Sequence, residues 1–180
     1  MLFRSARGTN GTSAEQADNS ADSAGAVYLF TRSDGTWAQQ AYVKASNTSA
    51  QDFFGISVAL SADGNTLAVG AIGESSAATG VNGNQADNSA DSAGAVYLFT
   101  RSSATWTQQA YVKASNTGCS DGFGQTVVLN SDGNTLAVGA IGESSAATGV
   151  NSPMLDASAP GAGAVYLFSR SGTVWSQSPL

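Results

Sequence analysis

Carboxylates are the side chains of this sequence whose spacing suggests chemistry. Glu74 and Glu143 stand 69 residues apart in identical local sequence, and two acids about 5 to 10 Å apart are what glycoside hydrolysis requires. Asp87 and Asp91 flank a short polar loop, and calcium prefers sites with several carboxylate oxygens. The sequence therefore offers one candidate acid pair and one candidate calcium loop, with Asp87 and Asp91 as its metal ligands.

The composition excludes several other chemistries. The 180 residues include no histidine and one cysteine, Cys119, which rules out a Ser-His-Asp triad, an imidazole metal site, an internal disulfide and a thiolate zinc cluster. Thirteen acidic and seven basic residues give a net charge of −6. The basic residues are scattered, so we expect no nucleic-acid partner. No stretch approaches the roughly 20 apolar residues of a membrane helix, so we expect no membrane span.

A repeat with a period of 69 residues organises the chain. Gly-Ala-Val-Tyr-Leu-Phe begins at Gly25, Gly94 and Gly163. Residues 63–82 are identical to residues 132–151, and 16–33 are identical to 85–102. Identity over such lengths indicates a tandem array rather than one ordinary domain.

Each period carries four strand signals and no sustained helical spacing. In the first period they lie at residues 26–32, 37–45, 55–60 and 66–72, where β-branched, aromatic or alternating apolar residues are separated by turn residues. Four short antiparallel strands per repeat are typical of a β-propeller blade; a parallel β-solenoid is the main rival, but its coils are far shorter. We predict an all-β fold, a β-propeller fragment of about two and a half four-stranded antiparallel blades.

These strand motifs resemble the FG-GAP repeat of integrin α-subunit propellers and of bacterial and marine surface proteins, and are closest to the bacterial variant. The segments that carry the resemblance are residues 54–60, 67–71 and 94–99, with copies at 123–124, 136–140 and 163–168, and the stretch 106–114. The resemblance implies that a blade begins at the Phe-Gly strand near the propeller axis and ends at the Trp strand on the outside.

The resemblance also sets the expected domain boundaries. Propellers close with about four to eight blades, so we expect the remaining blades of a longer parent chain, or self-association, to complete the ring. Leu2-Phe3-Arg4-Ser5 is also what the end of a common sequencing adapter would encode, so our hypothesis is that Met1 is not the natural start and that the first segment is artefactual. The expected units are a non-repeat segment at 1–15, an outer half-blade with its preceding loop at 16–53, a complete blade at 54–122, and a nearly complete, truncated blade at 123–180.

Calcium is a weaker expectation than the blade fold. Many members of the family carry an Asp-x-Asp-x-Asp-Gly loop after the Phe-Gly strand, whereas residues 61–65 and 130–134 each contain one Asp and are predicted to form hairpin turns. The loop of Asp87 and Asp91 recurs at 18–22, but the third copy has Pro160 in place of the second acid. A solvated loop is therefore favoured over a calcium site there, and no cofactor is expected.

The long connections are expected to form a binding face. Antiparallel strands send alternate connections to opposite ends of a blade, so the connections at 46–53 and 73–93 share one end, and long loops on a rigid scaffold often bind partners. Since Glu74 and Glu143 recur from blade to blade, we favour a loop-bracing role for them over catalysis. The acidic residues predicted for this face are Asp52, Glu74, Asp121, Glu143 and Asp156.

The three tryptophans of the sequence occupy the same position in successive repeats. Trp37, Trp106 and Trp175 could stack against sugars, but packing between blades is favoured.

We predict a non-catalytic segment of a secreted or cell-surface protein that binds a protein or glycan in adhesion. The alternatives are part of a propeller enzyme acting on polysaccharide, with its catalytic residues outside this chain, and a purely structural repeat array.

Overall fold

Three antiparallel sheets make up the part of the chain that the structure describes. The computed structural model describes residues 19–152, 154 and 156–178, so the segment 1–15 lies outside the described residues. Within that part of the chain there is no helix of the length and hydropathy needed to cross a bilayer. The two-stranded sheet, called the first sheet, consists of β1 (Val27–Ser33) and β2 (Thr36–Val43).

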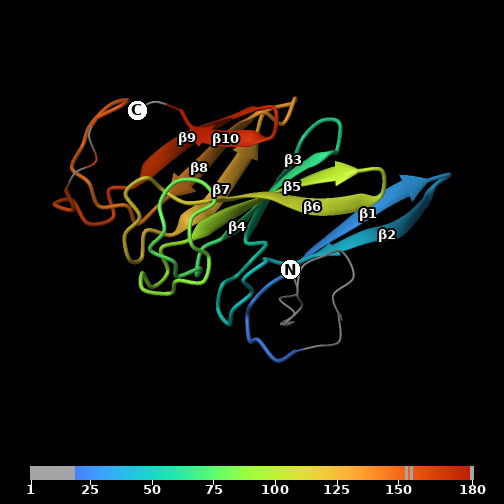
Figure 1. Ribbon diagram of the computed structural model, residues 1–180, viewed down its shortest axis with the longest axis horizontal. Helices are drawn as coiled ribbons and strands as arrows, with labels where there is room; N and C mark the ends of the chain where they lie inside the picture. The colour runs from blue at the N-terminus through green and yellow to red at the C-terminus, as the bar shows by residue number, and fades with distance from the viewer. Residues whose placement is uncertain (1–18, 153, 155, 179–180) are drawn as a thin grey trace.

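Each of the two four-stranded sheets is an up-and-down meander, with every strand hydrogen-bonded to the next one along the chain (Figure 1). The middle blade consists of β3 (Ser57–Leu60), β4 (Thr66–Ala71), β5 (Ala95–Ser102) and β6 (Thr105–Val112). The last blade consists of β7 (Phe123–Leu129), β8 (Thr135–Ala140), β9 (Ala164–Ser171) and β10 (Val174–Gln177). The prediction of an all-β fold with four-stranded antiparallel sheets is confirmed.

The alternation of side chains along β5 explains how the sheets stack. Val96 and Leu98 lie in the apolar core shared with the last blade, whereas Tyr97 and Phe99 lie in the core shared with the first sheet. Because successive strand residues point to opposite faces, one continuous apolar run serves two cores. The middle blade is thus buried on both faces at β5, whereas Val58 and Leu60 of β3 are each 50% exposed.

The Phe-Gly and Gly-Ala motifs meet where one blade joins the next. The amide of Phe123 donates to Ala93 O at 2.9 Å, and a Cβ on Gly94 would lie 2.1 Å from Phe123 O. Gly94 also has a φ of +82°, which glycine adopts without strain. The ring of Phe123 then packs edge-on against Tyr166, with 5.4 Å between centroids. Glycine is needed at this position for close approach as well as for conformation.

Tryptophan and glutamine side chains join neighbouring sheets on the outside. Trp106 donates its indole N–H to Gln40 Oε1 at 3.3 Å, and Trp175 donates to Gln109 Oε1 at 2.8 Å. Both indoles are buried, so the packing interpretation is confirmed for them. Trp37 is exposed, since no described strand lies on that side of the first sheet.

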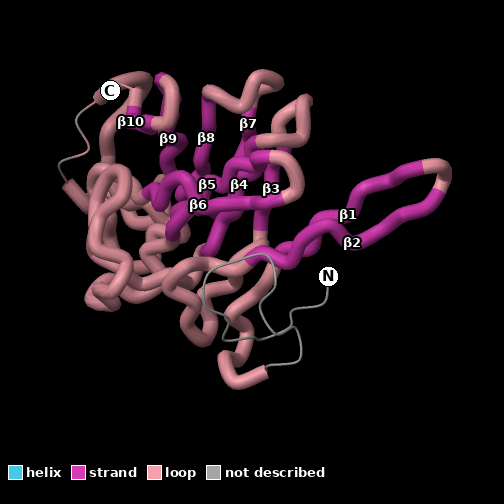
Figure 2. The backbone as a smooth tube through the Cα atoms, turned by 45° about the vertical axis from the view of Figure 1, so that its right-hand side comes forward, coloured by secondary structure: helices cyan, strands magenta, loops and turns pink. Residues whose placement is uncertain are grey.

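Short turns and long loops lie at opposite ends of the sheets, as the meander requires. The turns after β1, β3, β5, β7 and β9 are tight, whereas β4–β5 and β8–β9 are joined by long loops (Figure 2). Asp63 closes the turn of residues 61–65 by accepting hydrogen bonds from the Asn65 amide at 3.0 Å and the Ser61 hydroxyl at 2.5 Å, which lower the pKa of Asp63 to about 2. The segment forms the predicted hairpin turn.

Candidate binding face formed by the long loops

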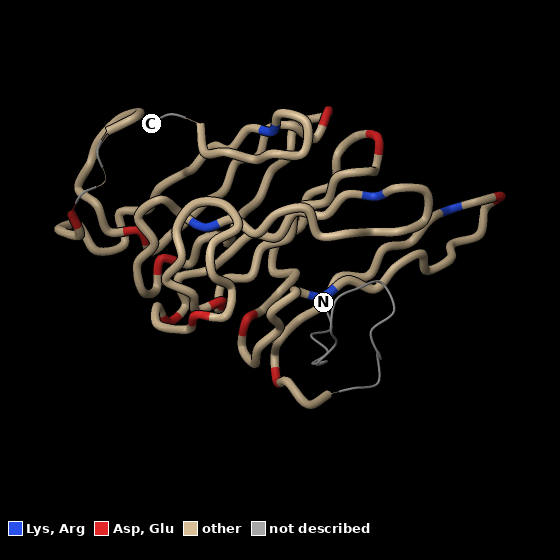
Figure 3. The backbone as a smooth tube through the Cα atoms, viewed as in Figure 1, with Lys and Arg blue, Asp and Glu red and all other residues tan. Residues whose placement is uncertain are grey.

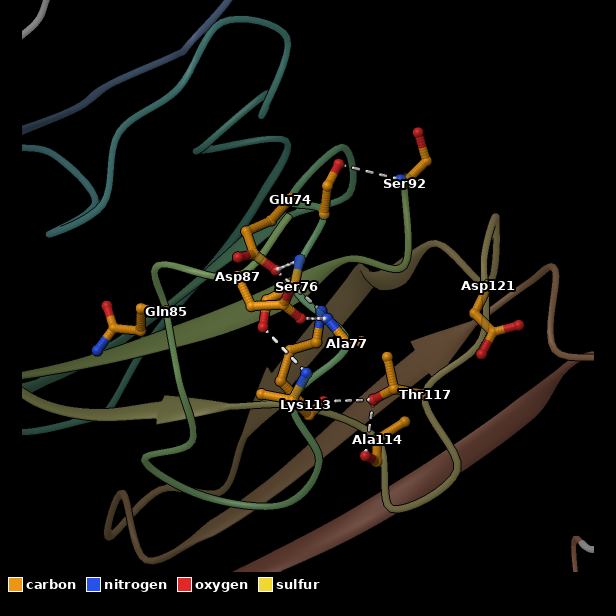
Figure 4. A network of polar contacts seen from close by, with 12 residues as sticks. Glu74, Ser76, Ala77, Gln85, Asp87, Ser92, Lys113, Ala114, Thr117 and Asp121 are labelled. Carbon is orange, nitrogen blue, oxygen red and sulfur yellow. Dashed lines mark hydrogen bonds and ion pairs between the residues drawn. The ribbon is translucent and has the colours of Figure 1, made fainter. Parts of the chain in front are cut away.

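A buried ion pair stands at the centre of the long-loop end of the middle blade. Glu74 follows β4 and Lys113 follows β6; their Oε2 and Nζ atoms are 2.9 Å apart, and both side chains are almost fully buried. The backbone N–H of Ser76 donates to the same oxygen at 3.2 Å. Burial lowers the pKa of Lys113, while the charge of Glu74 opposes that change. The pair ties the start of the β4–β5 loop to the end of β6 (Figure 4).

Asn47 extends this network to a tyrosine and to the preceding loop. Its Nδ2 donates to Glu74 Oε1 at 3.1 Å and to Gln85 O at 2.9 Å, and its Oδ1 accepts from the Tyr97 hydroxyl at 2.5 Å. Burial and the nearby charge of Glu74 raise the pKa of Tyr97 well above its usual range, so the phenol stays a neutral donor. The loop that contains Asn47 is thereby joined to the β4–β5 loop and to β5.

In its described part, the last blade contains the homologous contacts of asparagine, serine and tyrosine and no homologous lysine. Asn116 Nδ2 donates to Glu143 Oε1 at 2.8 Å, the Ser145 amide donates to the same atom at 3.1 Å, and the Tyr166 hydroxyl donates to Asn116 Oδ1 at 2.5 Å. The position 69 residues after Lys113 lies beyond residue 180.

Asp52 and Asp121 close the shorter loops. Asp52 Oδ2 accepts from the Ser49 amide and Asp121 Oδ2 accepts from the Gly118 amide, both at 2.7 Å. Burial, with a further contribution from the charge of Glu74, raises the pKa of Asp52 to about 7. Burial likewise raises the pKa of Asp121. Each carboxyl therefore fixes the turn that precedes a Phe-Gly segment.

The structure corrects the expected role of the acidic residues. Acidic positions do gather along the long loops (Figure 3), but the prediction that they are presented to a partner is wrong for four of the five. Those four, Asp52, Glu74, Asp121 and Glu143, are at most 5% exposed. The loops fold over carboxylates that accept their backbone N–H groups, which removes the carboxylates from solvent. These contacts agree with the loop-bracing interpretation of Glu74 and Glu143.

Asp156 is the exposed member of the set, and it shares its position in the repeat with Asp87. Asp87 accepts from the Ala77 amide at 2.7 Å and from the Ser89 hydroxyl at 3.0 Å, and Asp156 accepts from the Ala146 amide at 3.0 Å. These hydrogen bonds lower the pKa of both carboxyls. Each aspartate therefore links two separate segments of its long loop by hydrogen bonds.

The candidate calcium ligands have different surroundings. Asp87 is engaged with the loop backbone, whereas Asp91 is exposed. Among the described residues, no three histidine, cysteine, aspartate or glutamate side chains form a group that could hold a metal ion. Calcium at Asp87 and Asp91 stays a prediction.

Sequence reasoning missed two residues of the network, Asn47 and Lys113. A signal was present: Lys-Ala-Ser-Asn-Thr occurs at residues 44–48 and again at 113–117. A lysine directly after an apolar strand segment, three residues before an asparagine, is an unusual candidate for burial. Its repetition at the same interval could have marked both residues as partners of the repeated glutamate.

The stacked sheets, with long loops held by hydrogen bonds to carboxylates, define a tandem-repeat protein built of blades. The family model of the FG-GAP repeat matches residues 37–99 and 106–168. The chain belongs to the FG-GAP repeat family, whose repeats imply propeller blades. Comparison with curated proteins gives no significant match.

The matched sequence unit does not coincide with a blade. The first match begins in β2 and ends in β5, and the second begins in β6 and ends in β9. One sequence repeat therefore spans the outer strand of one sheet and the first three strands of the next. The main strand contacts between neighbouring sheets, those of β7 with β3 and β4, join two different sequence units.

Proposed function

We propose that this FG-GAP segment is a non-catalytic binding module of a secreted or cell-surface protein, and that its long-loop end contacts a protein or a glycan in adhesion. The observation that carries the proposal is the internal fastening of the loops. Two carboxylates hold the β4–β5 loop by accepting its backbone N–H groups: the buried Glu74 accepts from Ser76, and the partly exposed Asp87 accepts from Ala77. A loop held in this way loses little conformational freedom when it binds.

The exposed chemistry of the long loops suits recognition. Asn88 and Ser89 are exposed in the β4–β5 loop, and amide and hydroxyl groups serve sugars and peptide backbones equally well. Glu74 is committed to Lys113, Asn47 and Ser76, which supports a structural rather than an acid-base role for it. The enzyme alternative would need residues outside this chain.

A glycan array and a panel of extracellular proteins, probed with the full chain, test the proposal. Asn88→Arg places a bulky charge on the long-loop end, and Ala104→Arg places the same charge on the exposed β5–β6 turn at the opposite end. We expect Asn88→Arg to weaken binding at least fivefold and Ala104→Arg to leave it unchanged. Equal weakening by both variants would contradict the choice of face. Absence of any ligand would favour the purely structural array.

Calorimetric titration with calcium addresses the metal prediction separately. Because the loop contacts of Asp87 do not involve the Asp91 side chain, Asp91→Asn leaves them in place. A saturable heat that disappears in this variant would establish calcium at the loop. No saturable heat would leave the solvated loop as the correct interpretation.

A further inference from the structure

An amine, a carboxylate and an amide are linked by hydrogen bonds at the long-loop end of the middle blade. Glu74 Oε2 accepts from Lys113 Nζ at 2.9 Å, and Glu74 Oε1 accepts from Asn47 Nδ2 at 3.1 Å. The amine comes from the end of β6 and the amide from the β2–β3 loop, and both are held on the two oxygens of one carboxylate. Two reactive groups that are held together in this way react far faster than the same groups free in solution.

The surroundings of Lys113 favour its neutral, nucleophilic form. The lysine and Glu74 are at most 1% exposed, so bulk water is kept from the amine. Burial lowers the pKa of Lys113, although the charge of Glu74 opposes that change. A desolvated lysine is a common type of activated nucleophile, and a carboxylate within hydrogen-bond distance can accept its proton.

The amide of Asn47 is polarised at its oxygen. The Tyr97 hydroxyl donates to Asn47 Oδ1 at 2.5 Å. Burial, with the charge of Glu74, raises the pKa of Tyr97 well above its usual range, so the phenol stays protonated. A donor in this position stabilises the negative charge that develops on Oδ1 when the amide carbon is attacked. Gln85 O accepts from Nδ2 at 2.9 Å and helps to fix the orientation of the amide.

We propose that the side chains of Lys113 and Asn47 become joined by an intramolecular amide bond, an isopeptide cross-link. The lone pair of the neutral Lys113 amine attacks Asn47 Cγ, and the charge that forms on Oδ1 is held by the Tyr97 hydroxyl. Glu74 takes the excess proton from Nζ and passes it to Nδ2. The Cγ–Nδ2 bond then breaks and ammonia leaves, so that one amine and one amide give one new amide and one ammonia. The reaction needs no oxidant and no second substrate.

The cross-link would enclose the whole middle blade, because all four of its strands lie between residues 47 and 113. A force that pulls on the two ends of the chain would then pass through the bond instead of unfolding the blade. The reaction takes place once, within the chain, and turns over no external substrate, so Glu74 keeps its loop-bracing role afterwards. The inference does not depend on the ligand proposed for the long-loop end.

Intact mass spectrometry of the full chain, purified and then incubated at neutral pH, tests the inference. We expect a mass lower than that of the sequence by one ammonia molecule. Hydrolysis of an amide side chain would raise the mass instead, and an amide between Lys113 and Glu74 would lower it by one water. An unchanged mass after prolonged incubation, or the loss of water alone, would overturn the inference. This measurement does not depend on the folding of a variant.

Digestion with trypsin locates the bond. Because trypsin does not cleave after an acylated lysine, the fragment 45–101, which contains Asn47, should be recovered joined to the fragment 102–170, which contains Lys113. A single asparagine that cyclises onto its own backbone also releases ammonia, but it joins no two fragments. Loss of ammonia without the joined fragment would therefore contradict the inference.

Three variants, each checked for folding by circular dichroism, separate the roles. Lys113→Arg keeps the positive charge beside Glu74, but its guanidinium stays protonated, so we expect no loss of ammonia. Glu74→Gln removes the proton acceptor and should slow the loss about a hundredfold or more. Asn116→Ala is the matched control, since Asn116 contacts Glu143 and no lysine among the described residues pairs with that glutamate.

The control variant is expected to lose ammonia as fully as the unaltered chain. On a denaturing gel the cross-linked chain should migrate faster than Lys113→Arg, because a closed loop keeps the unfolded chain more compact. Loss of ammonia in Lys113→Arg, or equal migration of the two chains, would overturn the inference.

Discussion

The middle and last blades have nearly the same strand sequences in different surroundings. β5 reads Ala-Val-Tyr-Leu-Phe-Thr-Arg-Ser, and β9 differs from it by one serine. Val96 is fully buried, whereas Val165, its counterpart in β9, is 70% exposed. The middle blade has a sheet on either face, but among the described residues the last blade has a sheet on one face. Burial in this fold is thus a property of the stack rather than of the strand.

The long-loop ends of the middle and last blades also differ in their surroundings. The network around Glu74 contains a cation, and among the described residues the network around Glu143 contains none, although both glutamates stand in the same 20-residue sequence. Equivalent substitutions in the two blades should therefore have unequal effects. Such pairs of variants isolate the contribution of the neighbouring sheet.

The largest difference is expected at the glutamates. Glu74→Gln leaves the buried Lys113 ammonium without its counter-charge, which should lower the free energy of unfolding by about 3 to 5 kcal/mol. Glu143→Gln strands no cation and should change it by less than about 1 kcal/mol. Guanidinium unfolding at pH 7, followed by circular dichroism, measures both. Equal losses would mean that the ion pair contributes nothing specific.

The apolar strand positions provide the second pair. Leu98→Ala opens a cavity in a core that is closed on all sides and should cost about 3 kcal/mol. Leu167→Ala removes a side chain that is about half exposed and should cost less than about 1 kcal/mol. Thermal unfolding with the same chain as reference checks the order. A large effect of Leu167→Ala would indicate that the outer face of β9 is covered in solution.

A pair of glycines tests the close approach of the two blades. A Cβ on Gly70 would lie 2.0 Å from Gly124 O, whereas the nearest atom to a Cβ on Gly139 is Thr126 Cβ at 3.6 Å. Gly70→Ala should therefore cost about 2 kcal/mol through displacement of β7. Gly139→Ala should be neutral or slightly stabilising, because alanine restricts the unfolded chain. Denaturant midpoints compare the two, and equal midpoints would contradict the observed spacing.

The smallest expected effect is a pH dependence set by the short loops. The pKa of Asp52 is raised to about 7 by burial, so the folded protein holds this proton more tightly than the unfolded chain. The stabilisation is fully present below about pH 4 and is lost as the pH rises through 7. Asp52→Asn should remove at least about 1 kcal/mol of that dependence, and Asp121→Asn should remove less. Unfolding between pH 5 and 8 measures it, and an unchanged slope in Asp52→Asn would be the contrary result.

Much of this fold was predictable because its determinants are local and repeated. The period of 69 residues, the apolar runs and the turn residues placed strands at 26–32 and 66–72, and the structure has β1 at Val27–Ser33 and β4 at Thr66–Ala71. The repetition of Glu74 and Glu143 indicated a role in maintaining the blade. Lys113 and Asn47 were missed because their partner lies in another strand or loop, at a separation that spacing does not reveal.

The sequence by itself determined the repeat, the strand order within a blade and the absence of histidine chemistry, since each depends on residue type and short-range pattern. The tertiary structure alone decided which copies of a residue are buried. Trp106 is enclosed and Trp37 is exposed, and Glu74 pairs with Lys113, whereas no cation among the described residues pairs with Glu143. Identical sequences differ here because desolvation and charge pairing depend on the neighbouring sheet.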